Sequence, residues 1–261
     1  MKNLHFNLSG PAGKPVIIFL HGFLGSSADW DFAVEHFQFD YQCLCVDLPG
    51  HGQTRLADPK HYSIPITARL LIDLLDQLQI KKANLLGYSM GGRVALYLAV
   101  HYPSNFEKII LESASPGLED VTERKKRQEQ DEQLAHVLEK KNLKQFLREW
   151  YHRPLFKNLL EQADFEKIFQ RRLKNNPIEL AKSLRYMGVG NQDSLWPRLP
   201  EIHLPVLLLA GEMDQKFCDI AQRMQKMNPG FTLAIIEDSG HTIHFENEKR
   251  FLQKVSDFLL S

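Results

Sequence analysis

The sequence predicts an α/β fold: a mostly parallel central sheet flanked by helices, with an inserted helical cap. Three observations lead to this prediction. Short apolar segments alternate with amphipathic helical patterns, which is typical of a parallel sheet covered on both faces. The apolar segment Ala83 to Leu86 runs into Gly87-Tyr88-Ser89-Met90-Gly91, which places a serine between two glycines in a strand-to-helix turn. Between Glu112 and Leu204 the alternation stops, and helical patterns follow one another.

The expected strands are short apolar runs, and the expected helices have apolar residues at helical spacing. The strands are expected near Val16 to Leu20, Gln42 to Val46, Ala83 to Leu86, Lys108 to Glu112, Val206 to Ala210 and Leu233 to Ile236. The helices are expected near Ile66 to Gln79, Met90 to Tyr102 and Glu248 to Leu260. The first residues, Met1 to Phe6, lack the long apolar stretch of a signal peptide and are expected to form a further strand.

The domain organisation follows from the interruption of this alternation. Residues 1–115 and 195–261 are expected to form one core, and residues 116–194 a helical cap inserted into it. Ser115-Pro116-Gly117 marks the start of the insertion, and Pro197, Pro200 and Pro205 mark the return to the sheet. A cap over the carboxyl ends of the strands would shape a pocket and exclude water, so we expect the chemistry at the boundary between the two parts.

The glycine-flanked Ser89 predicts a nucleophile elbow, in which small neighbours allow a strained turn. A serine hydroxyl becomes a useful nucleophile or base only when a histidine takes its proton and a third group orients that histidine. Asp214 follows one expected strand and His241 follows the next, which gives the order Ser, Asp, His of an α/β-hydrolase. His244 is the nearest alternative to His241, but it falls within the following turn and helix start.

An oxyanion site needs backbone N–H groups aimed at developing negative charge. Met90, directly after the serine, is expected to supply one of them, and Phe23 in His21-Gly22-Phe23-Leu24-Gly25 the other. His21 is expected to hold this loop by hydrogen bonds rather than to act as an acid or base.

Several cationic side chains fall near the expected pocket. Arg93 lies one turn after Ser89 on the same helix. Arg124 and Arg127 are three residues apart and share a helix face, so they could point together under the cap. The alternative is a solvated helix with paired charges, because the basic start of the segment Arg124 to Glu132 is followed by an acidic half.

Composition limits the possible partners and cofactors. Of the 261 residues, 43% are apolar, and 32 basic residues balance 32 acidic ones, so nothing global favours nucleic acid or an anionic membrane. The longest apolar runs are strand-sized. Cys43, Cys45 and Cys218 have neither disulfide-framework nor metal-ligand spacing, and no metal or organic cofactor is expected. Free buried thiols indicate a reducing, cytoplasmic location.

Further motifs resemble one enzyme family over nearly the whole chain, and they lie in both the core and the cap. They are Gly87-Tyr88-Ser89-Met90-Gly91-Gly92-Arg93, Val46-Asp47-Leu48-Pro49-Gly50-His51-Gly52, Glu123-Arg124 with Arg127, Trp150-Tyr151 with Pro154-Leu155-Phe156, and Gly190-Asn191-Gln192. Together they resemble the 2-succinyl-6-hydroxy-2,4-cyclohexadiene-1-carboxylate synthases of menaquinone biosynthesis. The arginine after the double glycine and the cap motifs are the more specific part of this resemblance, since the other motifs occur across many α/β-hydrolases.

The resemblance implies a lyase on a hydrolase fold, which removes pyruvate from a small substrate bearing three carboxylates. Ser89, activated by His241 and Asp214, would take the proton beside the succinyl ketone, and the N–H groups of Phe23 and Met90 would stabilise the enolate. The substrate-binding residues implied by the family are Tyr88, Arg93, Arg124, Arg127, Trp150, Phe156, Arg172 and Lys216. Arg171 adjoins Arg172 and is the alternative at that position. Several arginines suit a tricarboxylate, because each can bind a carboxylate through two hydrogen bonds.

The sequence leaves two alternative hypotheses about the function open. The same triad serves carboxylesterases and carbon–carbon bond hydrolases, so a serine-dependent hydrolase is the main alternative. A non-catalytic ligand-binding protein on the same fold is the second, although an intact triad argues against it.

Overall fold

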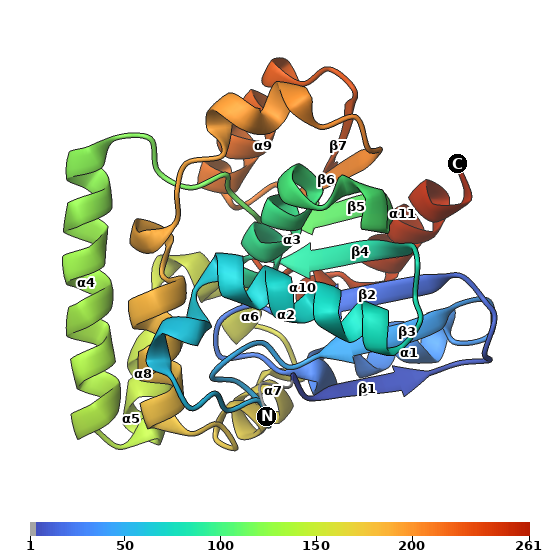
Figure 1. The fold of residues 1–261 in the computed structure, drawn as a ribbon. Coiled ribbons are helices and arrows are strands. Elements are labelled where there is room, and N and C mark those ends of the chain that lie inside the picture. The colour runs from blue at the N-terminus through green and yellow to red at the C-terminus, as the bar shows by residue number, and fades with distance from the viewer. Residues whose placement is uncertain (1–3) are drawn as a thin grey trace.

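The computed structural model describes residues 4–261 and contains a seven-stranded sheet in the order β1-β3-β2-β4-β5-β6-β7 (Figure 1). The strands are β1 (Phe6–Ser9), β2 (Val16–Leu20), β3 (Gln42–Val46), β4 (Ala83–Tyr88), β5 (Phe106–Glu112), β6 (Val206–Gly211) and β7 (Phe231–Ile236). Only β1 is antiparallel to its neighbour, and every other pairing is parallel. The prediction of a mostly parallel sheet is therefore confirmed.

The six strands β2 to β7 lie where the sequence predicts them, with ends that differ by at most two residues. The expected first strand begins later, at Phe6, and the Met1 to Asn3 part of that prediction lies outside the described residues. No helix between residues 4 and 261 is both long and apolar enough to span a bilayer.

Helices cover both faces of the sheet. The core helices are α1 (Asp31–Phe37), α2 (Ile64–Gln77), α3 (Met90–His101), α9 (Gln215–Met227), α10 (Ile243–Glu246) and α11 (Glu248–Leu260). Side chains of α2, α3 and α9 join one apolar cluster with alternate sheet residues such as Ile18, while α1 and α11 join a second cluster with Ile17 and Phe19. Successive residues of β2 thus enter opposite layers, as the pleat of a strand requires.

The cap consists of helices between β5 and β6. They are α4 (Val121–Lys140), α5 (Leu143–Tyr151), α6 (Lys157–Leu160), α7 (Phe165–Arg172) and α8 (Pro177–Met187). In Figure 1, α4 stands at the edge of the molecule, away from the sheet, with α8 beside it. The cap residues form an apolar cluster of their own, which also takes in Leu24 from the loop after β2.

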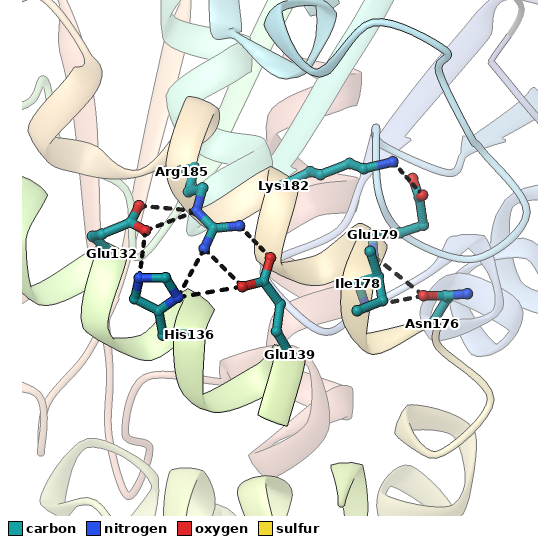
Figure 2. Close-up of polar contacts among 8 residues, drawn as sticks. All are labelled: Glu132, His136, Glu139, Asn176, Ile178, Glu179, Lys182 and Arg185. Carbon is teal, nitrogen blue, oxygen red and sulfur yellow. Dashed lines mark hydrogen bonds and ion pairs between the residues drawn. The ribbon is translucent and has the colours of Figure 1, made fainter. Parts of the chain in front are cut away.

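Polar contacts fix α8 between α4 and the core. Arg185 of α8 binds the carboxylates of Glu132 and Glu139 on α4, with distances of 2.9 Å from Nε to Glu132 Oε2 and from Nη2 to Glu139 Oε2 (Figure 2). His136 lies between the same two carboxylates, at 3.3 and 3.4 Å. At the other end of α8, Glu179 accepts a hydrogen bond from the hydroxyl of Tyr62 in the core. Helix α8 is therefore tied to α4 through Arg185 and to the core through Glu179 and Tyr62.

Candidate active site

Ser89 lies at the end of β4 and caps α3, in the turn that the sequence predicts. Its backbone has φ 49° and ψ −104°, a conformation that is rare for a residue with a side chain. The turn is possible only because its neighbours are small: a Cβ on Gly91 would collide with the carbonyl oxygen of Leu20, and one on Gly87 with the carbonyl of Gly91. The Ser89 N–H donates to the carbonyl of Glu112 at 2.8 Å, which fixes the turn to the end of β5.

Ser89, His241 and Asp214 form a continuous hydrogen-bonded chain. His241 Nε2 lies 3.1 Å from Ser89 Oγ, and His241 Nδ1 lies 2.7 Å from Asp214 Oδ2. Asp214 follows β6 and caps α9, where its side chain also accepts the N–H of Phe217 at 3.4 Å. His241 and Asp214 are buried. This geometry suits transfer of a proton from Ser89 to His241, with Asp214 holding the ring orientation.

The loop after β2 approaches the elbow from the other side. Gly91 N–H donates to the carbonyl of His21 at 3.1 Å, which ties the two predicted oxyanion segments together. His21 Nε2 accepts the N–H of Leu48 at 3.0 Å and Nδ1 donates to the carbonyl of Gly22 at 2.7 Å. Burial lowers the pKa of His21, so its neutral form is favoured, as these roles require. His21 holds the loop, and its expected structural role is confirmed.

A cavity of about 800 Å³ opens above Ser89 between core and cap. Core and cap both line it, as expected from an inserted cap. The predicted site residues that line it are Phe23, Tyr88, Ser89, Met90, Arg93, Arg127, Trp150, Phe156, Arg172, Lys216 and His241. Asp214 lies behind His241, and Arg124 does not reach the cavity.

The expectation that Arg124 and Arg127 point together under the cap is wrong for Arg124. Arg124 is not among the residues that line the cavity; it is directed to the segment after α8, where its Nη1 lies 3.5 Å from the fully exposed carboxylate of Asp193. Arg127 does line the cavity, and its Nε donates to Asp131 Oδ1 at 2.9 Å. Residues three apart on a helix differ in direction by about 60°. This difference is enough for Arg127 to line the cavity while Arg124 lies outside it.

Arg93 lies half-buried beneath the cap and has neutral partners. Its Nη1 donates to Gln192 Oε1 at 3.0 Å and its Nη2 to the carbonyl of Met187 at 2.7 Å. Burial lowers the pKa of Arg93 to about 10, and the nearby charge of Arg127 acts in the same direction. The guanidinium is therefore a desolvated cation oriented by amide and carbonyl oxygens.

Arg172, and not its neighbour Arg171, lines the cavity. Its Nη1 lies 2.5 Å from Asp29 Oδ1 and its Nε donates to the hydroxyl of Tyr151 at 3.0 Å. Arg172 and Asp29 are both buried, and this cation lowers the pKa of Asp29 against the opposing effect of burial. Arg172 thus lines the cavity while its charge is paired with the carboxylate of Asp29.

Sequence reasoning missed several features of the site. Arg153 lines the cavity, and so do Ser113, Ser115, Gln130 and Gln133. Nothing in the spacing of Gln130 and Gln133 distinguishes them from other polar residues of the cap, because their direction depends on how α4 packs, and Ser113 and Ser115 lie in the connection after β5, which has no such spacing. The position of Arg153 between the Trp150-Tyr151 and Pro154-Leu155-Phe156 motifs is the one signal that could have singled it out.

The sheet topology, the strained elbow and the hydrogen-bonded Ser–His–Asp chain define an enzyme of the α/β-hydrolase fold. Consistently, residues 15–248 match the family model of the alpha/beta hydrolase fold. Within that fold, the chain belongs to the family of 2-succinyl-6-hydroxy-2,4-cyclohexadiene-1-carboxylate synthases.

Three relatives support this assignment. A protein of Bacillus subtilis (strain 168), provisionally named as this synthase, is 41% identical over 97% of this chain and 93% of its own. The 2-succinyl-6-hydroxy-2,4-cyclohexadiene-1-carboxylate synthase of Serratia proteamaculans (strain 568) is 30% identical over 97% of this chain and 96% of its own. The solved structure of MenH from S. aureus superposes with a TM-score of 0.94, at 37% identity, and the match covers 100% of this chain and 98% of that one.

Proposed function

We propose that this chain is a carbon–oxygen lyase of menaquinone biosynthesis. It eliminates pyruvate from 2-succinyl-5-enolpyruvyl-6-hydroxy-3-cyclohexene-1-carboxylate and forms 2-succinyl-6-hydroxy-2,4-cyclohexadiene-1-carboxylate. Membership of the synthase family supports this reaction. The structural observation that carries it is a hydrogen-bonded Ser–His–Asp chain that opens into a cavity lined by several cationic side chains.

The first step is removal of a proton from the ring carbon that carries the succinyl group. Ser89 Oγ takes this proton as its own proton passes to His241 Nε2, along the 3.1 Å contact between them. The electron pair of the C–H bond moves to the adjacent ketone oxygen, which becomes an enolate. We assign the N–H groups of Phe23 and Met90, whose residues both line the cavity, to this oxygen.

The second step breaks the bond between the ring and the enolpyruvyl oxygen. The enolate electrons return to the ring, the ring double bond shifts by one position, and the carbon–oxygen electrons leave with pyruvate in its enolate form. The proton held on His241 then returns to the leaving group, which yields pyruvate and restores the resting triad. No water is consumed, so exclusion of bulk water by the cap favours elimination over hydrolysis.

The proposed partner is the small tricarboxylate substrate. Arginines that line the cavity suit its charge, and no nucleic acid, membrane, metal or organic cofactor is part of the proposal. A cytoplasmic location is included in the proposal. It is supported by the three cysteines, which are free and buried in the described chain; burial raises the pKa of Cys43 to about 11 and that of Cys45 well above its ordinary value.

The test is to follow pyruvate release and the ultraviolet absorbance of the conjugated diene on freshly prepared substrate. We expect the wild-type protein to form both products at equal rates and the Ser89→Ala variant to form neither at a measurable rate. A parallel reaction in ¹⁸O-labelled water should give a ring product without a solvent-derived hydroxyl group, because elimination adds no water to the ring. If simple esters are cleaved while neither product appears, the chain is a hydrolase and the proposal fails.

A further inference from the structure

The walls of the active-site cavity contain positive charge without acidic side chains. Its cationic lining residues within the described chain are Arg93, Arg127, Arg153, Arg172 and Lys216, and no Asp or Glu lines it. Two of the five have carboxylate partners behind the wall: Arg127 pairs with Asp131 and Arg172 with Asp29. Among residues 4–261, Arg93, Arg153 and Lys216 form no ion pair with an acidic side chain. Three cations are thus left for a ligand to neutralise.

Arg153 is held in place by its neighbours. It precedes the short 3₁₀ turn Pro154–Phe156 and has φ −68° and ψ 147°, the extended conformation that a following proline favours. Its N–H donates to the carbonyl of Trp150 at 3.3 Å. The carbon of its guanidinium lies 4.0 Å from the centre of the Trp150 ring. Trp150 in turn contacts Phe23, with ring centres 5.2 Å apart, so the arginine is supported from the loop that carries a proposed oxyanion donor.

The surroundings of Arg153 disfavour an isolated cation. Its side chain is half-buried, and burial lowers its pKa, with the charge of Arg127 as the next cause. Asp131 is the nearby acid that opposes this effect, but it is hydrogen-bonded to Arg127. A guanidinium near an aromatic ring keeps N–H groups for other partners, since the ring accepts none of them in a conventional hydrogen bond. A carboxylate in the cavity would relieve the uncompensated charge and accept these donors.

We propose that Arg153 is a substrate-binding residue that holds one of the carboxylates of the substrate, with Trp150 as the support that orients its guanidinium. This inference rests on the proposed function, because the substrate of that reaction carries three carboxylates. Arg93, Arg153 and Lys216 then supply one unpaired cation for each carboxylate. Arg127 and Arg172, which are neutralised by Asp131 and Asp29, shape the wall and add hydrogen-bond donors.

The test compares Arg153→Gln and Arg153→Lys with wild type. Loss of a charge-assisted hydrogen bond predicts a rise in KM of roughly ten- to a hundredfold for Arg153→Gln, with a smaller change in kcat. Arg153→Lys keeps the charge without the planar donor set, so it should recover part of the loss. The control is Arg148→Gln, which removes one positive charge from the exposed face of α5 outside the cavity. It should leave KM unchanged.

Salt provides a readout that a merely structural role would not change. KM of the wild type should rise with ionic strength. The slope of KM against ionic strength (the salt slope) should be smaller in Arg153→Gln, because one unit charge no longer attracts the substrate. Calorimetric titration with citrate, used as a tricarboxylate probe, should show weaker binding by the same variant. The melting temperature of each variant separates these effects from a loss of folding.

The outcomes distinguish this inference from the proposed function. If wild type is an active lyase and Arg153→Gln matches it in KM, salt slope and citrate affinity, the role of Arg153 is wrong and the function stands. If wild type has no lyase activity but binds citrate through Arg153, the function fails and the anion site stands. Wild type that neither reacts nor binds citrate overturns both.

Discussion

His244 and Glu112 form a buried pair directly behind the nucleophile elbow. His244 Nδ1 lies 2.8 and 2.9 Å from the two carboxylate oxygens of Glu112, and the His244 N–H donates to the same carboxylate at 3.1 Å. The Glu112 backbone carbonyl accepts the N–H of Ser89, and the His244 ring packs edge-on against Tyr88. The two histidines of this loop therefore have separate carboxylates: Asp214 serves His241, and Glu112 fastens the segment that carries it.

Glu112→Ala is expected to lower the free energy of unfolding by roughly 2–5 kcal/mol, because it leaves the buried donors of His244 without a partner. Urea denaturation measures this change. Glu107→Gln is the matched control, since Glu107 is exposed on the same strand, and its effect should stay within about 0.5 kcal/mol. Equal stability of Glu112→Ala and wild type would contradict a structural role for the pair.

His241→Ala and Asp214→Asn are expected to lower kcat, by roughly 10⁴-fold or more for His241→Ala and by up to about 10⁴-fold for Asp214→Asn. The first removes the proton acceptor of Ser89, and the second removes the carboxylate that orients it. Because the three residues act as a unit, adding Ser89→Ala to His241→Ala should cause little further loss. Steady-state kinetics of diene formation give these values. Full multiplication of the single effects would show that the residues act independently.

The contribution of Arg93 to substrate affinity can be tested with Arg124 as the control. Arg93→Gln is expected to raise KM about tenfold or more, because it removes a half-buried cation that faces the cavity. Arg124→Gln should change KM less than about twofold, since its partner Asp193 is fully exposed and surface pairs contribute little. The same kinetic assay checks both variants. A larger effect at Arg124 would contradict its placement outside the cavity.

The contacts of Arg185 with Glu132 and Glu139, called here the Arg185 clamp, predict a pH dependence of stability. The hydrogen bond from Arg185 lowers the pKa of Glu139 from 4.5 to about 2, so the folded state favours the ionised carboxylate. The stabilisation is present above about pH 4.5 and is lost as the pH falls towards 2. Glu139→Gln should therefore flatten this part of the melting temperature profile. Identical acid profiles of wild type and variant would exclude a contribution from the clamp.

The elements that the sequence predicts well are those whose information is local. The elbow is contiguous in sequence, and the internal strands are apolar runs because both faces of a parallel sheet are covered. Asp214 and His241 follow from strand ends, which the topology brings to one edge of the sheet. α9 was missed because its signal is the spacing of Cys218, Ala221 and Met224 within a largely polar segment.

The parts that could not be predicted depend on packing between distant segments. The pairing of Arg172 with Asp29 joins residues 143 positions apart, and that of His244 with Glu112 joins residues 132 apart. Which side of α4 faces the cavity is set by its contact with α8, so spacing alone could not separate Arg124 from Arg127. The direction of the Arg153 side chain also depends on packing, so its place in the cavity wall could not be predicted from the sequence.

The strained backbone of Ser89 has a consequence for how this protein can be altered. A residue with a side chain in this conformation costs about 1–3 kcal/mol, and glycine at the same position would recover part of it. Catalysis thus requires serine at position 89, whereas stability favours glycine there. A library of variants selected only for thermal stability should therefore accumulate replacements of Ser89. Such variants would be more stable but would lack the catalytic base.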